Sequence, residues 1–242
     1  MKKTDTRIEN EIRHGASIAD NPGKVWNWES PAGKKRWQRR TAMLSGHISP
    51  EMYVLELGCG TGYYTKELLQ TGARICAIDI SPDLLAIARH NIHTDRVSFV
   101  QENAYSMGFK DNTFDTVVGS SVLHHLDIDK AMQEVYRVLK PGGEIVFTEP
   151  NMLNPQIMIQ KNIPFIKQKM GDSLDETAFF KWQLHRILKK NGFRDIRIEP
   201  FDFLHPAIPE MFVPAFESLN HVLEKTPFIK EIAGSLFIRA SK

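Results

Sequence analysis

Residues 54–62, Val-Leu-Glu-Leu-Gly-Cys-Gly-Thr-Gly, are the most informative stretch of this chain of 242 residues. A short apolar run leads into three glycines at alternate positions, Gly58, Gly60 and Gly62. Glycine lets the backbone turn sharply and lets a ligand approach the main chain without a Cβ in the way. The backbone amides at the start of the helix that follows then face that ligand. The stretch therefore predicts a strand, a ligand-binding turn and a helix.

An acidic residue stands at an informative distance from this turn. Asp79 closes the next apolar run, residues 74–79, and follows Gly58 by 21 positions. An acid about 20 residues after a glycine-rich turn, at the end of the second strand, is placed to hydrogen-bond a ribose. The turn and the acid together predict a bound nucleoside.

The glycine spacing narrows the kind of nucleoside. A dinucleotide fingerprint places its third glycine five residues after the first, but that position holds Tyr63, and the third glycine comes at Gly62. A phosphate-binding P-loop ends in Gly-Lys-Ser/Thr, and the chain has no such tripeptide there. The spacing therefore matches neither of these two motifs, and a glycine-rich turn in some other α/β protein remains an alternative to a nucleoside site.

Composition sets limits on the class of protein. With 42% hydrophobic and 25% charged residues, the chain is expected to fold as one domain. A formal net charge of +2 does not by itself indicate binding to nucleic acid or to an anionic membrane. The apolar runs have the length of strands, so no membrane span is expected. The N-terminus lacks the apolar centre of a signal peptide, and Cys59 and Cys76 make no metal motif, so we expect a cytoplasmic protein without a metal.

The pattern of apolar runs predicts an α/β fold. Strands alternate with helices, which indicates βαβ units and a parallel sheet covered on both faces. The expected strands are 53–57, 74–79, 97–100, 114–119 and 143–148, and the helices between them are 62–71, 82–93 and 127–140.

The two ends of the chain are less regular. We expect a flexible start and a loop over residues 1–30, and a helix from Pro31 to about His47. The second half should contain a helix over 175–190, strands over 193–198 and 235–240, and irregular, proline-punctuated segments at 150–173 and 203–233. The expected organisation is one domain, with an N-terminal cap segment 1–49, a cofactor-binding core 50–150 and a substrate-side half 151–242.

Several motifs in order resemble the class I S-adenosylmethionine-dependent methyltransferases. The string Glu-x-Gly-x-Gly-x-Gly at 56–62 resembles the first motif of that family, and the stretches 97–104, 114–126, 138–147 and 191–193 resemble later ones. The resemblance implies a Rossmann-like sheet of seven strands, mostly parallel with an antiparallel last strand. It also implies S-adenosylmethionine as cofactor and methyl transfer as activity.

The resemblance implies roles for named residues around the cofactor. Gly58, Cys59, Gly60 and Gly62 would hold its methionine end, and Asp79 would accept both ribose hydroxyls. Ile80 would line the adenine pocket, and Ser120 and Ser121 would flank the cofactor at the carboxyl edge of the sheet. Glu56 would act near the cofactor's amino group, or would instead cap neighbouring amides.

The adenine contact has two candidates. The family often has Asp-Ala where this chain has Asn103-Ala104. An amide oxygen can accept a hydrogen bond from the adenine amino group, and Asn103 shares strand parity with Phe99 and Gln101. A shift of one residue would place Glu102 on the ligand side instead.

The candidates for catalysis are His125 and Glu149. Methyl transfer mainly needs alignment, which can supply roughly 7–11 kcal/mol of a barrier, so no triad is expected. His125, and less so His124, is a candidate general base, with packing at the start of the next helix as the alternative. Glu149 is expected to face the same cleft, where it would bind the acceptor or play a structural part.

An aromatic and basic cluster precedes the core. Trp26, Trp28 and the run 36–40 would meet the cofactor's sulfonium or its carboxylate. The alternatives are a solvated basic helix with Trp37 packed inward, or a contact with RNA.

The two irregular segments are rich in Met, Ile, Phe and Pro, which suits a cap with an apolar lining. The sequence therefore predicts a small-molecule methyltransferase whose acceptor is a small, lipid-linked or sugar-linked compound. The alternatives are an RNA or protein methyltransferase and a non-catalytic module that binds the cofactor. The acceptor atom and the oligomeric state stay open.

Overall fold

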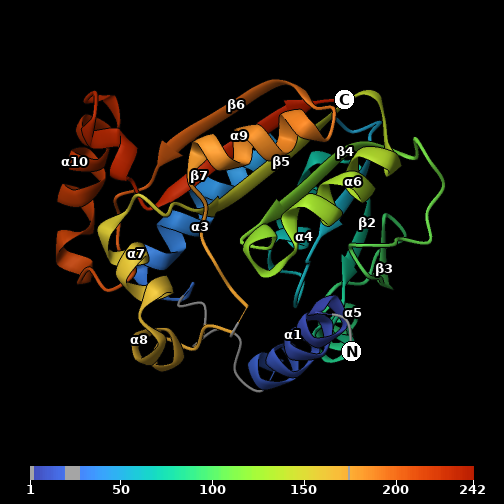
Figure 1. The fold of residues 1–242 in the computed structure, drawn as a ribbon, viewed down its shortest axis with the longest axis horizontal. Coiled ribbons are helices and arrows are strands. Elements are labelled where there is room, and N and C mark those ends of the chain that lie inside the picture. Colours follow the sequence, from blue (N-terminus) through green and yellow to red (C-terminus); the bar gives the residue numbers. More distant parts are fainter. Residues whose placement is uncertain (1–2, 20–27, 174) are drawn as a thin grey trace.

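The computed structural model describes residues 3–19, 28–173 and 175–242. Seven strands form one sheet in the order β3-β2-β1-β4-β5-β7-β6 (Figure 1). Strands β1 to β5 pair in parallel, and β7 runs antiparallel to both β5 and β6. The expected seven-stranded sheet with an antiparallel last strand is thus confirmed. The strands are β1 Tyr53–Leu57, β2 Arg74–Asp79, β3 Val97–Gln101, β4 Phe114–Ser120, β5 Leu139–Pro150, β6 Arg194–Phe201 and β7 Ser235–Ser241.

Nine α-helices and four short 3₁₀ turns are seen in the described part of the chain. The α-helices are α1 Lys3–Ala19, α3 Pro31–Ser45, α4 Tyr63–Leu68, α5 Pro82–Asn91, α6 Ile128–Val138, α7 Pro155–Asn162, α8 Pro164–Lys169, α9 Lys181–Lys190 and α10 Val213–Lys225. The 3₁₀ turns are η1 Leu69–Thr71, η2 Leu123–His125, η3 Glu210–Phe212 and η4 Ile229–Ile232.

Two hydrophobic cores cover the two faces of the sheet. Successive side chains of a strand point to opposite faces, so Leu55 and Leu57 of β1 pack with α6 and α9, whereas Val54 packs with α3, α4 and α5. Figure 1 shows α6 and α9 in front of the strands and α3 and α4 behind them. Burial on both faces explains why these strands read as continuous apolar runs.

The expectation for residues 1–30 was wrong in its first part. Residues 3–19 form helix α1 rather than a flexible start. A Cβ on Gly15 would lie 2.6 Å from Ser81, so α1 packs tightly on the start of α5, and Ile18 is buried beside it. Ile8, Ile12 and Ile18 recur at helical spacing among many polar side chains, and the expectation of a flexible start did not take this spacing into account. Trp26 lies outside the described residues.

Three other elements have bounds that differ from those expected from the sequence. Helix α9 begins at Lys181, not at residue 175, because residues 175–180 run along the end of β5, where Phe179 pairs with Asn151. The helix expected over 62–71 is split into α4 and η1. Strand β5 begins earlier, at Leu139, which pairs with Phe114 of β4.

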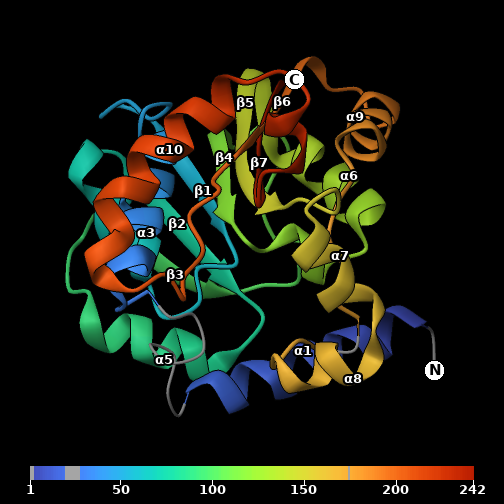
Figure 2. The same cartoon turned by 90° about the vertical axis from the view of Figure 1, so that its left-hand side faces the viewer.

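The two proline-punctuated segments form helices at the carboxyl ends of the parallel strands. The first contains α7, which Asn154 caps by accepting hydrogen bonds from two amides, and then α8. The second contains η3, α10 and η4. Figure 2 shows α10 and the α7–α8 pair on the side of the molecule that faces the viewer, with α1 beneath them. The segments therefore lie toward the end of the sheet where ligands bind, and their role as a cap stays a prediction.

Candidate functional site: an adenosyl-cofactor pocket

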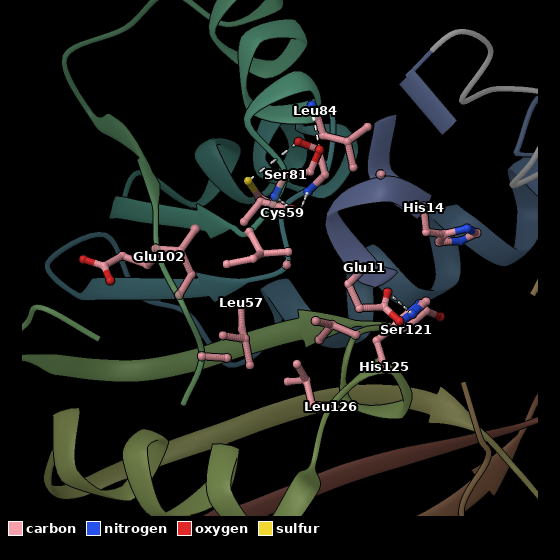
Figure 3. Close-up of a pocket in the computed structure, with 18 of the residues that line it drawn as sticks. Glu11, His14, Leu57, Cys59, Ser81, Leu84, Glu102, Ser121, His125 and Leu126 are labelled. Carbon is pink, nitrogen blue, oxygen red and sulfur yellow. Dashed lines mark hydrogen bonds and ion pairs between the residues drawn. The ribbon is translucent and has the colours of Figure 1, made fainter. Parts of the chain in front are cut away.

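A cavity of about 200 Å³ lies at the carboxyl ends of β1, β2 and β4. Leu57 and Ile78 line its floor from the strand ends, and α1 covers it with Glu11 and His14 (Figure 3). Ligands of open α/β sheets bind outside the carboxyl ends of the strands, where the strand order reverses. Here that reversal lies between β1 and β4, next to the cavity.

The glycine turn needs glycine for two reasons. Gly58, Gly60 and Gly62 have φ of 68°, 54° and 84°, in the region that L side chains rarely adopt. In addition, a Cβ on Gly58 would lie 2.3 Å from Cγ2 of Val122. The turn therefore packs against the loop after β4, and its main chain borders the cavity without a side chain between.

Asp79 is aimed at the same space. Its carboxylate accepts hydrogen bonds from the backbone amides of Gly60 at 2.8 Å and of Ser81 at 2.9 Å. Burial raises the pKa of Asp79, and the two amides oppose that rise. The carboxylate borders the cavity and keeps lone pairs for further donors, which is what a ribose diol requires.

The walls fit an adenosyl group. Ile80, Ala104 and Leu126 present apolar surface around the carboxylate of Asp79, and the glycine turn provides a close approach to main chain. Apolar walls with a few convergent polar groups are typical of a nucleoside pocket. The residues present thus fit S-adenosylmethionine, whose adenosyl part would lie against Asp79 and Ile80.

Glu102 and Asn103 both border the cavity, so its lining does not separate the two candidates for the adenine contact. In Figure 3 the carboxylate of Glu102 points away from the other labelled residues, and its Oε1 lies 3.3 Å from the amide of Gly108. Oδ1 of Asn103 accepts a hydrogen bond from the amide of Tyr105 at 3.0 Å. This geometry favours Asn103 on the ligand side.

Most of the residues expected to hold the cofactor lie together. The cavity is bordered by Gly58, Cys59, Gly60, Asp79, Ile80, Asn103, Ala104, Ser120 and Ser121. Ser121 has a φ of 56°, an unusual conformation for a residue other than glycine. It stands where the chain leaves β4 for the cavity wall.

Glu56 and Gly62 are not among the residues that border the cavity. Glu56 is buried beneath the turn, where Thr65 Oγ1 donates to its Oε2 at 2.6 Å. Burial raises the pKa of Glu56 to about 8, so this carboxyl holds a proton at neutral pH. The contact with Thr65 connects β1 to helix α4. Because Glu56 does not border the cavity, its contact with the cofactor stays a prediction.

The two histidines have different surroundings. Nδ1 of His124 lies 2.7 Å from Oε2 of Glu149, and the ring is buried. His125 borders the cavity, with Nδ1 2.9 Å from Oε2 of Glu11 and 3.7 Å from Oε1 of Glu176. Burial lowers the pKa of His125, but the carboxylates of Glu11 and Glu176 outweigh burial and raise it. His125 is therefore the histidine with access to a ligand.

Glu149 does not face the cleft as expected. It is fully buried, and it is not among the residues that border the cavity. Its Oε1 accepts hydrogen bonds from the amides of Val122 at 2.9 Å and of Leu123 at 2.7 Å. These bonds occupy the carboxylate and hold the loop that carries His125, so the geometry favours a positioning role.

Helix α1 contributes site residues that the sequence did not reveal. Arg7 donates to the carbonyl oxygen of Asp175 at 2.7 Å, and Ser173 donates to Glu11 at 2.7 Å. These contacts link α1 to the segment before α9 and close the cavity from above. Their partners are more than 150 residues apart in sequence, so no local pattern could have shown them.

The basic run of α3 is paired with acids rather than solvated. Nε of Arg36 and Nη2 of Arg40 lie 2.8 and 3.1 Å from the same oxygen of Asp202. Arg39 binds Glu224 through two hydrogen bonds of 2.6 and 2.7 Å. These pairs attach α3 to the C-terminal segment. Trp28, in contrast, does border the cavity, with the Arg40 guanidinium 5.8 Å from its ring.

Comparison with known proteins agrees with this geometry. Residues 55–147 match the model of a methyltransferase domain family. The chain is 29% identical over 211 residues to a demethylmenaquinone methyltransferase of Lactiplantibacillus plantarum, covering 77% of this chain and 89% of the relative. It is 34% identical over 198 residues to a ubiquinone/menaquinone biosynthesis C-methyltransferase of Pasteurella multocida, covering 76% and 69%.

A solved structure supports the fold. A methyltransferase of Thermotoga maritima, described as a possible histamine N-methyltransferase, superposes with a TM-score of 0.69 over 95% of this chain and 99% of that one. The two are 18% identical, so the likeness concerns the fold alone. None of the helices in the described ranges is both long and apolar enough for a bilayer crossing. By its fold, its pocket and these relatives, the chain belongs to the class I S-adenosylmethionine-dependent methyltransferases, and it methylates a small molecule.

Proposed function

We propose that the acceptor is a hydroxylated aromatic ring of the quinol type, and that the methyl group goes to a ring carbon. The support is the relation to two quinone methyltransferases, one of which aligns over 89% of its own length. That alignment covers 77% of this chain, so it is longer than the family domain at residues 55–147.

The cavity supports an acceptor of this kind. Trp28, Tyr63 and Tyr64 line it with aromatic surface, and His125 and Ser121 are polar groups on the side of α1. A flat ring with hydroxyl groups needs such walls for its faces and a few polar groups for its edge. Helix α1 covers this space and excludes water from it.

The chain's own residues have three tasks. The glycine turn and Asp79 hold the cofactor, which supplies an electrophilic methyl group on its sulfonium. The carboxylate of Glu149 accepts hydrogen bonds from backbone amides of the loop 121–125. These bonds fix the position of His125 at the end of that loop. Alignment of the ring carbon with the methyl group then accounts for most of the rate.

We assign the proton transfer to His125. A phenolic hydroxyl that loses its proton makes the neighbouring ring carbon more nucleophilic. The Glu11 and Glu176 carboxylates raise the pKa of His125, so that imidazole is a better proton acceptor than a free one. The imidazole would hold this proton, with its charge stabilised by the two carboxylates, while the ring carbon takes the methyl group. Loss of that carbon's hydrogen to solvent as a proton would then restore the aromatic ring, and the imidazole would return its own proton to the ring oxygen.

A polymer acceptor is less favoured by this geometry. Arg36, Arg39 and Arg40 of α3 are paired with Asp202 and Glu224, so these three arginines are not free to bind RNA. The cavity is also covered by α1, which suits a compound small enough to be enclosed.

The deciding experiment uses the full chain with S-adenosylmethionine and a demethylated naphthoquinol with a short side chain. We expect a product one methyl group heavier by mass spectrometry, with the new methyl on a ring carbon by NMR. The Asp79→Asn variant is the control for turnover at this site. Methylation of folded RNA or of a protein, with no turnover of quinols, catechols or other phenols, would contradict the proposal.

A further inference from the structure

Exposed hydrophobic side chains are concentrated in the two proline-punctuated segments, 150–173 and 203–233. Within the part of the chain that the structure describes, every strongly exposed large hydrophobic side chain lies between residues 158 and 232, and all but Trp182 fall in 158–170 or 211–232. Phe165 is 73% exposed, Met211 77% and Phe228 89%. We call the exposed apolar side chains of these two segments the apolar rim. Exposed apolar side chains that gather in two segments on one side of a protein indicate an interaction site.

The rim occupies one side of the molecule. Figure 1 shows α7, α8 and α10 together at the left, and Figure 2 shows the same three helices turned toward the viewer. Helix α10 buries Val213 and Asn220 against the body and exposes Phe216, Leu219 and Val222. Its apolar stripe therefore points outward, away from both cores.

The charges around the rim are not balanced. The acids of the second segment turn toward bases of the body, since Glu217, Glu224 and Glu231 pair with Lys35, Arg39 and Lys181. Among the described residues of the two segments, Lys169, Lys225 and Lys230 are exposed. The acids that are more than a third exposed there are Glu210 and Glu217, and Glu217 is paired with Lys35. The rim is thus apolar with a positive border, which is complementary to a surface that is apolar inside and negative outside.

The conformation and exposure of Phe228 also indicate that its side chain serves in an interaction rather than in folding. Its φ is 66°, which is unfavourable for a bulky side chain. A residue that is strained and almost fully exposed contributes little to folding, so its side chain is expected to contact something other than this chain.

We propose that the apolar rim docks on an anionic lipid bilayer and lies at its interface without crossing it. Apolar side chains beside lysines are the composition of interfacial membrane segments, and no helix of the described residues is suited to cross. The inference rests on the proposed quinol acceptor, because an acceptor with a long isoprenoid chain resides in the bilayer.

The test is sedimentation of the full chain with vesicles of phosphatidylcholine containing phosphatidylglycerol. The apolar variant is Phe165→Ser/Met211→Ser/Phe228→Asn, and we expect its vesicle affinity to fall by about tenfold or more. Asparagine tolerates a positive φ, so this variant keeps the backbone near residue 228. Trp182→Ser removes an exposed aromatic side chain on α9 and is the matched control, which should bind like the native chain.

The charge arm tests the anionic headgroups separately. Lys169→Gln/Lys225→Gln/Lys230→Gln should bind several-fold more weakly and should lose most of the salt dependence of binding. The control variant is Lys66→Gln/Lys110→Gln/Lys189→Gln, which removes three exposed lysines outside the two segments. We expect it to bind vesicles like the native chain, with the same salt dependence.

The outcomes are distinct from those for the proposed function. Both rim variants should turn over a short-chain acceptor in solution at the native rate. If the rim variants bind vesicles more weakly but the native chain methylates no quinol, the result would support docking and contradict the proposed acceptor. Absence of vesicle binding, equal binding of neutral vesicles by all variants, or a dimer in sedimentation velocity that the apolar variant dissociates would overturn docking.

Discussion

The carboxylate of Asp79 accepts a hydrogen bond of 2.8 Å from the backbone amide of Gly60, 19 residues earlier in the chain. The bond joins the end of β2 to the turn after β1. The acid that would hold the ribose thus also holds the turn that receives the cofactor. Loss of the carboxylate should affect the two halves of the pocket together.

Asp79→Asn should weaken cofactor binding by more than about 100-fold, which corresponds to roughly 3 kcal/mol. The amide cannot accept from Gly60, Ser81 and a ribose as the carboxylate can. Isothermal titration with S-adenosylmethionine measures the effect, and Asp83→Asn on the exposed side of α5 is the control. Micromolar affinity in the Asp79 variant would contradict its assignment.

Gly58→Ala should destabilise the fold more than Gly142→Ala. Both glycines have positive φ, of 68° and 77°. A Cβ on Gly58 would also collide with Val122, whereas nothing lies within 4 Å of one on Gly142. We expect a loss of about 1 kcal/mol for Gly142→Ala and about 3 kcal/mol or more for Gly58→Ala. Urea unfolding measures both, and equal losses would show that Gly58 is required only for its backbone angle.

His125→Asn should lower kcat by about 10²–10³-fold while the affinity for S-adenosylmethionine changes little. The native kcat should rise with pH through a pKa above 6.5, because the neighbouring carboxylates raise the pKa of His125. That rise should be absent in the variant. A variant that is slower but keeps the native pH profile would indicate a packing role.

The contribution of His125 to stability should depend on pH in a defined direction. Its folded pKa lies above the ordinary 6.5, so its ion pairs contribute fully below pH 6.5 and are lost as the pH rises through the folded pKa. Glu176 has a folded pKa of about 2 against an ordinary 4.5, so its contribution is full above pH 4.5 and is lost on acidification. The unfolding free energy that His125→Asn removes should therefore be larger at pH 5.5 than at pH 8.5. His90→Asn, at an exposed position of α5, is the control substitution.

Asp202→Asn should cost about 3–5 kcal/mol of unfolding free energy, because it leaves the buried guanidinium of Arg40 and that of Arg36 without their shared carboxylate. Glu217→Gln removes a pair with Lys35 in which both side chains are more than a third exposed, and should cost less than about 1 kcal/mol. Thermal or urea unfolding compares the two. Equal small losses would mean that α3 is not held to the C-terminal segment by Asp202.

Much of the fold followed from local patterns. The strands from β1 to β5 were predicted to within a few residues, because strands buried on both faces are continuous apolar runs. The glycines of the turn and Asp79 were found because their chemistry depends on short spacings along the chain. The antiparallel last strand came from the family resemblance and not from periodicity.

The covering helix could not be predicted in the same way. Helix α1 is held by Arg7, Glu11 and Gly15, which contact Asp175, His125 and Ser81 far along the sequence. Glu149 was expected in the cleft because strand ends face it, but its carboxylate turned to the amides of Val122 and Leu123. Both outcomes depend on which polar groups meet in space.

By itself, the sequence determined the sheet, the glycine turn and the acid beside it, since each is encoded by residues close together in the chain. Only the tertiary structure decided that α1 covers the cavity, that the arginines of α3 are paired, and that the hydrophobic residues of the caps face outward. These depend on contacts between distant segments, and an apolar residue in a sequence does not reveal whether a partner covers it.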